Sequence, residues 1–460
     1  MRKATLTAID LPDFGEPDVE PVIPAETYRA RVAEALRRAG ASGLDALVIY
    51  GDREHSANIG WATGYDPRFE EAICILVPGR TPHLLVGNEG WAYAGGAPGT
   101  FERILWPPLS LMGQPRDGTR PLAELLDAAG LRRGMRIGLA GWKGYETATG
   151  DSDADWFETP QFLVAGLAAL GKVGNAADLF MNPRDGLRVI NDVDQLAAFE
   201  FAATLTSAAI RRVILGTRPG MSEYEAAALA RFNGLPHSVH FMLSSGERTR
   251  FGLASPSSRR VAAPDPIACA FGLPGGLNCR AGFLAGSAAE LAPAIRDYVP
   301  KLVAPYFAAI AAWYQALGLG VAAGALYDAV MSRLGDPFFG VTLNPGHLIH
   351  LDEWVNSPVR QGSAIPLVSG MALQCDVIPA TGTAYFTTNI EDGIALADPA
   401  LRARFAGKYP EAWSRIERRR AFMADALGIA LAPEVLPFSN MPAWLPPFWL
   451  RPQLAMTMAG

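Results

Sequence analysis

In the first third of the chain, short apolar runs of strand length alternate with helical segments. This alternation constrains the fold more than any other feature. Tyr28, Val32 and Leu36 recur at helical spacing, and residues 121–131 also have the composition of a helix. The apolar runs of strand length are residues 46–50, 72–77, 83–86 and 135–139. Strands that alternate with helices are typical of an α/β domain. The sequence therefore predicts an α/β domain in the N-terminal part of the chain.

A turn-rich stretch followed by a long helix marks the end of this domain. Residues 182–186 read Asn-Pro-Arg-Asp-Gly, a composition that is typical of turns. Asp192, with Gln195 three residues later, resembles the capping box that begins a helix. Ser222 and Glu225 repeat this spacing, so a second helix is expected to begin there.

The chain has 460 residues, which is long for one domain and typical of two. We predict an N-terminal domain over residues 1–186 and a C-terminal domain over residues 187–460. We expect the second domain to consist mainly of strands and turns around apolar helices. Its tail, from Pro433 onward, is dense in Pro, Trp and Phe, so neither a regular helix nor a central strand is expected there.

Composition and charge exclude several classes of protein. Half of the residues are hydrophobic and the formal net charge is -6, so we expect a globular protein with no nucleic-acid partner. Residues 302–327 carry no charge, but Pro305 and several glycines favour two helices of a soluble core over a membrane span. The four cysteines form no CxxC pair, which predicts reduced thiols in a cytoplasmic protein.

Five short phrases in the second half of the chain occur in a characteristic order. They are residues 214–225, 245–249 with 265–272, 346–347, 370–376 and 389–392. In this order they resemble the catalytic domain of the pita-bread family, which includes methionine aminopeptidase, prolidase, aminopeptidase P and creatinase. The resemblance implies an α+β pita-bread domain in the C-terminal part of the chain.

Two segments of the first half, residues 50–58 and 63–68, are similar to the creatinase-type N-terminal domain. The resemblance therefore covers most of the chain. It implies an α/β creatinase-like N-terminal domain followed by the pita-bread domain, with two copies of the chain in a homodimer.

The resemblance also indicates which positions of this chain correspond to the metal ligands of the family. Its metallopeptidases hold two divalent ions with two Asp, one His and two Glu side chains. The corresponding positions here are Ala270, Arg280, His347, Asp376 and Glu391. Ala270 has no donor and Arg280 has the opposite charge. We predict that Arg280 replaces the cation and pairs with Asp376 or Glu391, which gives a metal-independent site. The alternative is one divalent ion held by His347, Asp376 and Glu391.

The same positions supply the candidate site residues. His347, Asp376 and Glu391 are the predicted catalytic residues, and His347 is the proton-transfer candidate because the ordinary pKa of histidine lies near neutrality. The predicted substrate-binding residues are Arg280, Arg68, His350, Asp352, Glu353 and His240. Arg68 lies in a loop that reaches the partner's active site in creatinase-type dimers, where it could grip a substrate carboxylate.

Three functions are compatible with this pattern. We expect a hydrolase that acts on a C–N bond of a small polar molecule or short peptide without a metal. The second is an Xaa-Pro-type metallopeptidase with divergent ligands. The third is a non-catalytic binding protein, which Ala270 and Leu253 at former catalytic positions would allow. Leu253 stands where creatinase-type enzymes carry a catalytic His, so the creatinase mechanism as such is not expected.

Overall fold

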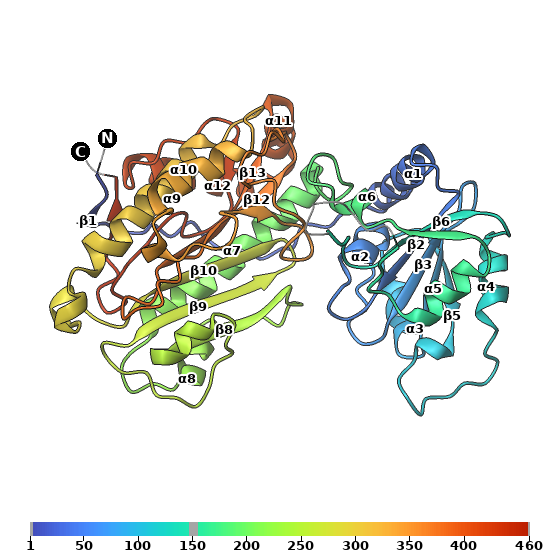
Figure 1. The fold of residues 1–460 in the computed structure, drawn as a ribbon, viewed down its shortest axis with the longest axis horizontal. Helices are drawn as coiled ribbons and strands as arrows, with labels where there is room; N and C mark the ends of the chain where they lie inside the picture. The colour runs from blue at the N-terminus through green and yellow to red at the C-terminus, as the bar shows by residue number, and fades with distance from the viewer. Residues whose placement is uncertain (1–2, 147–154, 459–460) are drawn as a thin grey trace. The chain divides into compact units, whose positions relative to one another are not determined.

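The computed structural model describes residues 3–146 and 155–458, which form two compact units (Figure 1). The smaller unit is Val22–Val189. The larger unit combines the residues before Val22 with those from Ile190 onward. The division at residue 189 lies close to the predicted boundary at residue 186. The first residues of the chain, however, belong to the larger unit and not to the N-terminal domain in which residues 1–186 had been placed.

The smaller unit is an α/β domain around a six-stranded sheet of order β5-β4-β3-β2-β6-β7. Its strands are β2 (Ala46–Gly51), β3 (Ala72–Leu76), β4 (His83–Val86), β5 (Glu102–Leu105), β6 (Arg136–Ala140) and β7 (Lys172–Asn175). Its helices are α1 (Ala25–Ala41), α2 (Ala57–Thr63), α3 (Gly90–Tyr93), α4 (Leu122–Ala129), α5 (Gln161–Ala168) and α6 (Asp178–Met181). Strands β2, β3, β4 and β6 fall where the apolar runs predicted them.

The larger unit contains a seven-stranded sheet of order β11-β12-β13-β10-β9-β8, with β14 paired to β13. The strands are β8 (Val239–Ser245), β9 (Pro266–Leu273), β10 (Gly276–Phe283), β11 (His347–Leu348), β12 (Ala372–Val377), β13 (Asn389–Leu396) and β14 (Val435–Pro437). A separate pair joins β1 (Thr5–Ala8) to β15 (Leu454–Thr457), and this pairing explains why the N-terminal residues belong here.

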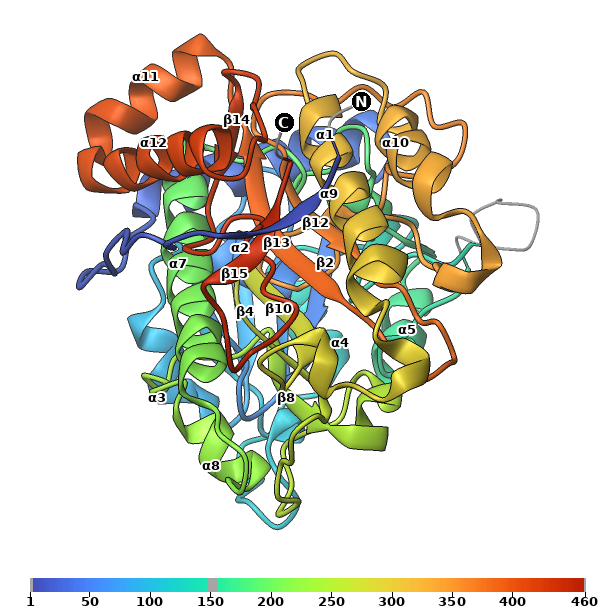
Figure 2. The same ribbon diagram turned by 90° about the vertical axis from the view of Figure 1, so that its left-hand side faces the viewer.

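Six α-helices accompany this sheet among the residues that the structure describes. They are α7 (Val193–Gly216), α8 (Glu223–Ala228), α9 (Ala304–Ala316), α10 (Gly324–Leu334), α11 (Pro399–Lys408) and α12 (Pro410–Asp425). Helix α7 packs along β9 and β10, and α9 packs against β12 (Figure 2). The uncharged stretch at residues 302–327 thus forms α9 and the start of α10. No helix in the described part of the chain is long and apolar enough to cross a membrane.

Helix caps begin α7 and α8 as the sequence predicted. The Asp192 carboxylate accepts hydrogen bonds from the backbone N–H groups of Asp194 and Gln195. Ser222 and Glu225 form a reciprocal capping box at the start of α8. Both caps satisfy amide groups that a helix leaves without partners in its first turn, so they fix where each helix begins.

The Pro- and Trp-rich tail is part of the core of the larger unit. Residues 441–450 form neither helix nor strand, as predicted. Trp444 and Trp449 are nevertheless buried, in one apolar cluster with Ile210 of α7 and Phe271 of β9. The tail therefore fills the interior of its own unit.

A buried ion cluster ties α7 to α12. Glu200 accepts two hydrogen bonds from Arg415, at 2.9 and 2.6 Å, and one from Arg419 at 2.7 Å. Burial alone would raise the pKa of Glu200, but the charges and hydrogen bonds of Arg419 and Arg415 outweigh it, so the pKa is lowered. Arg419 also donates to Thr204 and Asn440, which extends the cluster to the tail.

Replacing Glu200 should therefore destabilise the protein strongly. We expect Glu200→Gln to lower the free energy of unfolding by about 3–5 kcal/mol, because two buried guanidinium groups lose their counter-charge. Chemical denaturation followed by circular dichroism measures this change. Glu417→Gln, at an exposed position of α12, is the control and should change stability by less than about 0.5 kcal/mol. Equal effects of the two substitutions would contradict the cluster's role.

Candidate functional site

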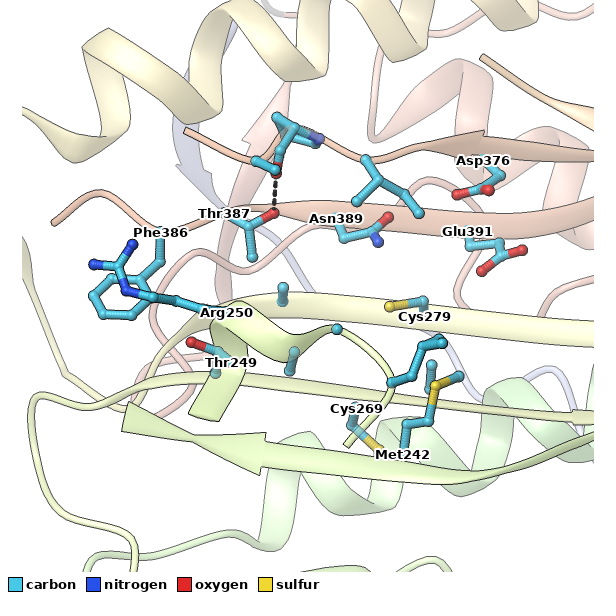
Figure 3. Close-up of a pocket in the computed structure, with 18 of the residues that line it drawn as sticks. Met242, Thr249, Arg250, Cys269, Cys279, Asp376, Phe386, Thr387, Asn389 and Glu391 are labelled. Atoms are coloured by element: carbon cyan, nitrogen blue, oxygen red, sulfur yellow. Dashed lines mark hydrogen bonds between the residues drawn. The ribbon is translucent and has the colours of Figure 1, made fainter. Parts of the chain in front are cut away.

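A cavity of about 320 Å³ lies on one face of the large sheet (Figure 3). Strands β9, β10, β12 and β13 form its walls, together with the 3-10 helix Gly246–Phe251 and the loop between β12 and β13. Its small or apolar lining residues include Ala268, Ala270, Leu277, Ala281 and Ile378. Its charged lining residues are Arg250, Glu353, Asp376 and Glu391. Asp376 and Glu391 lie at one end and Arg250 at the other (Figure 3).

Strand pairing brings the acidic residues together. Asp376 of β12 and Glu391 of β13 are direct partners in the antiparallel ladder, so their side chains lie on the same face of the sheet. His347 of β11 approaches both, with its Nε2 atom 3.9 Å from the Asp376 Oδ2 atom and 3.6 Å from the Glu391 Oε1 atom. Glu353 completes the group, since its carboxylate lies within 4.8 Å of ligand atoms of His347 and Glu391.

The orientation of the His347 ring is fixed by two contacts. Its Nδ1 atom lies 3.1 Å from the carbonyl oxygen of Leu348, which can only accept a hydrogen bond, so Nδ1 carries the proton. The ring also stacks on Trp354, with the two ring centroids 4.2 Å apart. The Nε2 atom faces the carboxylates, and in the neutral ring it is the acceptor through which histidine binds metal ions.

Three polar atoms at this end of the cavity are buried without a hydrogen-bond partner in the described part of the chain. They are Nε2 of His347, Oδ1 of Asp376 and Oε1 of Glu391. Burial, followed by repulsion from Glu391, raises the pKa of Asp376 well above its ordinary range. Burial, followed by repulsion from Glu353, does the same for Glu391. Such a group of unsatisfied acids is costly unless a cation joins it.

The donor set fits one divalent cation. A zinc or similar ion binds nitrogen and carboxylate oxygen at about 2.1 Å, so two of its ligands can lie no more than about 4.2 Å apart. The Nε2 atom of His347 meets this condition with both Asp376 and Glu391. Ala270 has no ligand atom for a second ion, and its partner across the ladder is Cys279. His347 and Glu391 can therefore share a single ion, and either Glu353, whose carboxylate lies within 4.8 Å of both, or Asp376 can complete the ligand set.

The expectation for Arg280 was wrong. Its side chain points away from the cavity, because the residue of β10 that faces Ala270 and Glu391 is Cys279. Arg280 is fully buried on the other face of the sheet, where it pairs with Asp392 at 2.7 Å. It therefore neither binds substrate nor replaces a cation between Asp376 and Glu391. The physical reason is that side chains alternate along a strand, so an alignment that is wrong by one residue places the side chain on the opposite face of the sheet.

The other predicted binding residues divide into two groups. Glu353 lines the cavity. His350 does not line it: the ring is fully buried and packs edge-on against Phe199 of α7, which corrects its assignment as a substrate contact. Asp352 and His240 also lie outside the lining. Their charges act on Glu353, whose pKa is raised chiefly by burial, further raised by Asp352 and lowered by His347 and His240.

Arg68 belongs to the smaller unit. Its Nε atom pairs with the Asp66 carboxylate at 2.8 Å. A role in the active site of a partner subunit, and the homodimer itself, remain predictions.

Sequence reasoning missed several residues of the cavity. Cys279, Asn389, Arg250 and Phe386 all line it. For Cys279 a signal existed, since it stands next to the predicted position. For Arg250 and Phe386 no local signal existed, because they meet only through the fold: the Arg250 guanidinium lies 4.3 Å from the centroid of the Phe386 ring.

Several solved structures have a fold similar to that of this chain. A prolidase from Thermococcus sibiricus aligns with a TM-score of 0.63 and 17% identity over 81% of this chain and 95% of the other. A prolidase from Pyrococcus horikoshii OT3 gives 0.60 and 15% identity over 80% and 95%. An X-Pro aminopeptidase from Thermotoga maritima MSB8 gives 0.59 and 15% identity over 80% and 95%. The chain has the prolidase fold.

This finding confirms the predicted combination of an α/β creatinase-like domain and an α+β pita-bread domain. The sequence itself matches no family model and no curated protein. At these identities the prolidase fold is shared, while the activity has to be inferred from the site.

The raised pKa values of Asp376 and Glu391 predict an unusual pH dependence of stability. A carboxyl group whose pKa rises on folding binds its proton more tightly in the folded state, so the free energy of unfolding falls as the pH rises above about 4 and through the folded pKa. We expect Glu391→Gln to flatten this fall and to stabilise chelator-treated protein at pH 7 by about 1–3 kcal/mol.

Denaturant titrations between pH 4 and pH 8 measure both effects. Glu417→Gln, at an exposed position of α12, is the control and should leave the pH profile unchanged. A loss of stability at pH 7 in Glu391→Gln would mean that the carboxylate is satisfied in the folded protein.

Proposed function

We propose that the protein is a hydrolase that cleaves the C–N bond of an amide or short peptide, with one divalent cation held by His347, Asp376 and Glu391. The observation that carries this proposal is the convergence of three buried, unpartnered donor atoms at one end of an apolar cavity. Nothing in a purely structural role requires such a group, and its repulsion lowers the stability of the fold.

The structure no longer supports the prediction of a metal-independent site. That prediction depended on Arg280 as a fixed positive charge among the carboxylates, and Arg280 instead neutralises Asp392 on the other face of the sheet. The cluster is thus left with an excess of negative charge, which favours the divergent-ligand alternative. The prolidase and X-Pro aminopeptidase structures that share the fold are named for cleavage of peptide C–N bonds, and this supports the same bond type here.

A bound divalent ion would polarise the substrate carbonyl and lower the pKa of a water molecule at the site. The protein supplies the remaining functions. Glu353 is less buried than Asp376 and Glu391, and its raised pKa suits it to accept a proton from water and donate it to the leaving nitrogen. Trp354 holds the His347 ring in place, and the largely apolar walls place hydrophobic surface beside the reacting bond.

Metal analysis of the purified protein tests the proposal. We expect about one equivalent of Mn, Co or Zn per chain after incubation with the ion and gel filtration, and a loss of binding in His347→Ala and Glu391→Gln. Glu353→Gln should retain the ion but reduce hydrolysis of short peptides and related amides by about 100-fold or more, because it removes the proton-transfer group.

Three outcomes would contradict parts of this assignment. Hydrolysis that persists after removal of all metal would restore the metal-independent enzyme. Two equivalents of ion per chain would show that Cys279 or another group holds a second ion. A protein that binds the ion but cleaves no amide in a broad screen would be a binding protein on the same fold. Arg333→Gln, on the exposed face of α10, is the control and should behave like the wild type.

A further inference from the structure

The end of the cavity opposite the carboxylates is built around Arg250 (Figure 3). Its Nε atom donates to Glu247 at 2.7 Å, but that carboxylate is 79% exposed and binds weakly. Its Nη2 atom donates to the carbonyl of Thr383 at 3.2 Å. Its Nη1 atom makes no hydrogen bond within the residues that the structure describes. The guanidinium therefore has capacity for one more anionic partner.

The loop between β12 and β13 holds Phe386 beneath this guanidinium. Phe386 has φ 54°, a left-handed backbone conformation that bulky residues rarely adopt. The Phe386 carbonyl accepts hydrogen bonds from the hydroxyl and the backbone N–H of Thr381, at 2.8 and 3.2 Å. Strained residues that the surrounding structure holds in place occur often at ligand sites. Here the strain fixes an aromatic platform on which Arg250 stacks at 4.3 Å.

The charges along the cavity would orient a ligand. Arg250 is the one basic residue among its described lining residues, and Glu353, Asp376 and Glu391 are the acidic ones. A ligand carboxylate would be repelled from the acidic end and attracted to Arg250. The wall between the two ends is mostly apolar, with Ala281 and Ile378 among its residues, and Asn389 adds one amide group to it (Figure 3). The cavity thus suits a ligand with an apolar body and one negative end.

The length of the cavity sets the size of that ligand. Glu391 marks the acidic end of the cavity, and Thr387, which follows Phe386, marks the basic end. The two residues are four positions apart on and just before β13, so their Cα atoms are about 13 Å apart if the chain is extended. A contact of about 3 Å at each end leaves about 7 Å. Extended peptide covers about 3.5 Å per residue, so two residues fit between the bond at the acidic end and the carboxylate at Arg250.

We propose that Arg250 and Phe386 form a subsite for the free carboxylate of a substrate that has two small or apolar residues after the bond to be cleaved. The substrate class is thus an N-acyl dipeptide or a tripeptide. The position of the cleaved bond rests on the proposed function, whereas the carboxylate subsite does not.

Binding titrations with three matched compounds test this proposal on the purified protein. They are N-acetyl-alanyl-leucine, N-acetyl-alanyl-leucinamide, which lacks the carboxylate, and N-acetyl-leucine, which is one residue shorter. We expect the first to bind about 10- to 100-fold more tightly than the amide, since a charged hydrogen bond to Arg250 is lost in the amide. N-acetyl-leucine should bind more weakly than N-acetyl-alanyl-leucine, because it cannot span both ends.

The variants separate this subsite from general effects. Arg250→Gln should remove the preference for the acid over the amide, and Glu247→Gln should increase it, because the competing carboxylate is gone. Arg333→Gln should retain the wild-type ratio. Circular dichroism of each variant confirms folding, which a partly exposed arginine is not expected to disturb.

Equal binding of acid and amide by the wild type, or a preference that survives in Arg250→Gln, would overturn the proposal. Absence of binding by all three compounds would also overturn it. Release of acetate is measured in the same samples. A carboxylate preference without cleavage would leave the subsite in place and contradict the proposed hydrolase activity alone.

Discussion

The buried pair of Arg280 and Asp392 determines which side chains reach the cavity. Arg280 also donates to the carbonyl oxygens of Trp444 and Met441, so it joins β10, β13 and the C-terminal tail on one face of the sheet. Because side chains alternate along a strand, this arrangement commits Cys279 and Glu391 to the opposite face. The positive charge therefore neutralises an acid in the interior and leaves the acids of the cavity uncompensated.

Most of the fold could be predicted from the sequence where local signals were strong. Strands β2 and β3 are fully buried and read as continuous apolar runs, and the caps at Asp192 and Ser222 gave the starts of two helices. Strands β5 and β7 were missed because they lie at the edges of the sheet and have mostly exposed or half-buried side chains. The pairing of β1 with β15 is not encoded locally, since its partners lie at opposite ends of the chain.

The site could be predicted only in part. The short sequence segments around His347, Asp376 and Glu391 identified these residues as site candidates, and the structure brings the three side chains together. The error at Arg280 arose because nothing in the local sequence sets the register after the turn at Gly275 and Gly276. In an antiparallel pair the register depends on hydrogen bonds to the neighbouring strand, which a single strand does not reveal.

The pairing of β1 with β15 has a consequence for synthesis of the protein. Unit Val22–Val189 is inserted between the two parts of the larger unit, so it can fold while the rest of the chain is still being made. Strand β1 is synthesised before the inserted unit, whereas its partner β15 lies about 450 residues later in the chain. Until β15 has been synthesised, β1 has an unpaired hydrogen-bonding edge, which is the kind of surface on which chains of a polysome can associate wrongly.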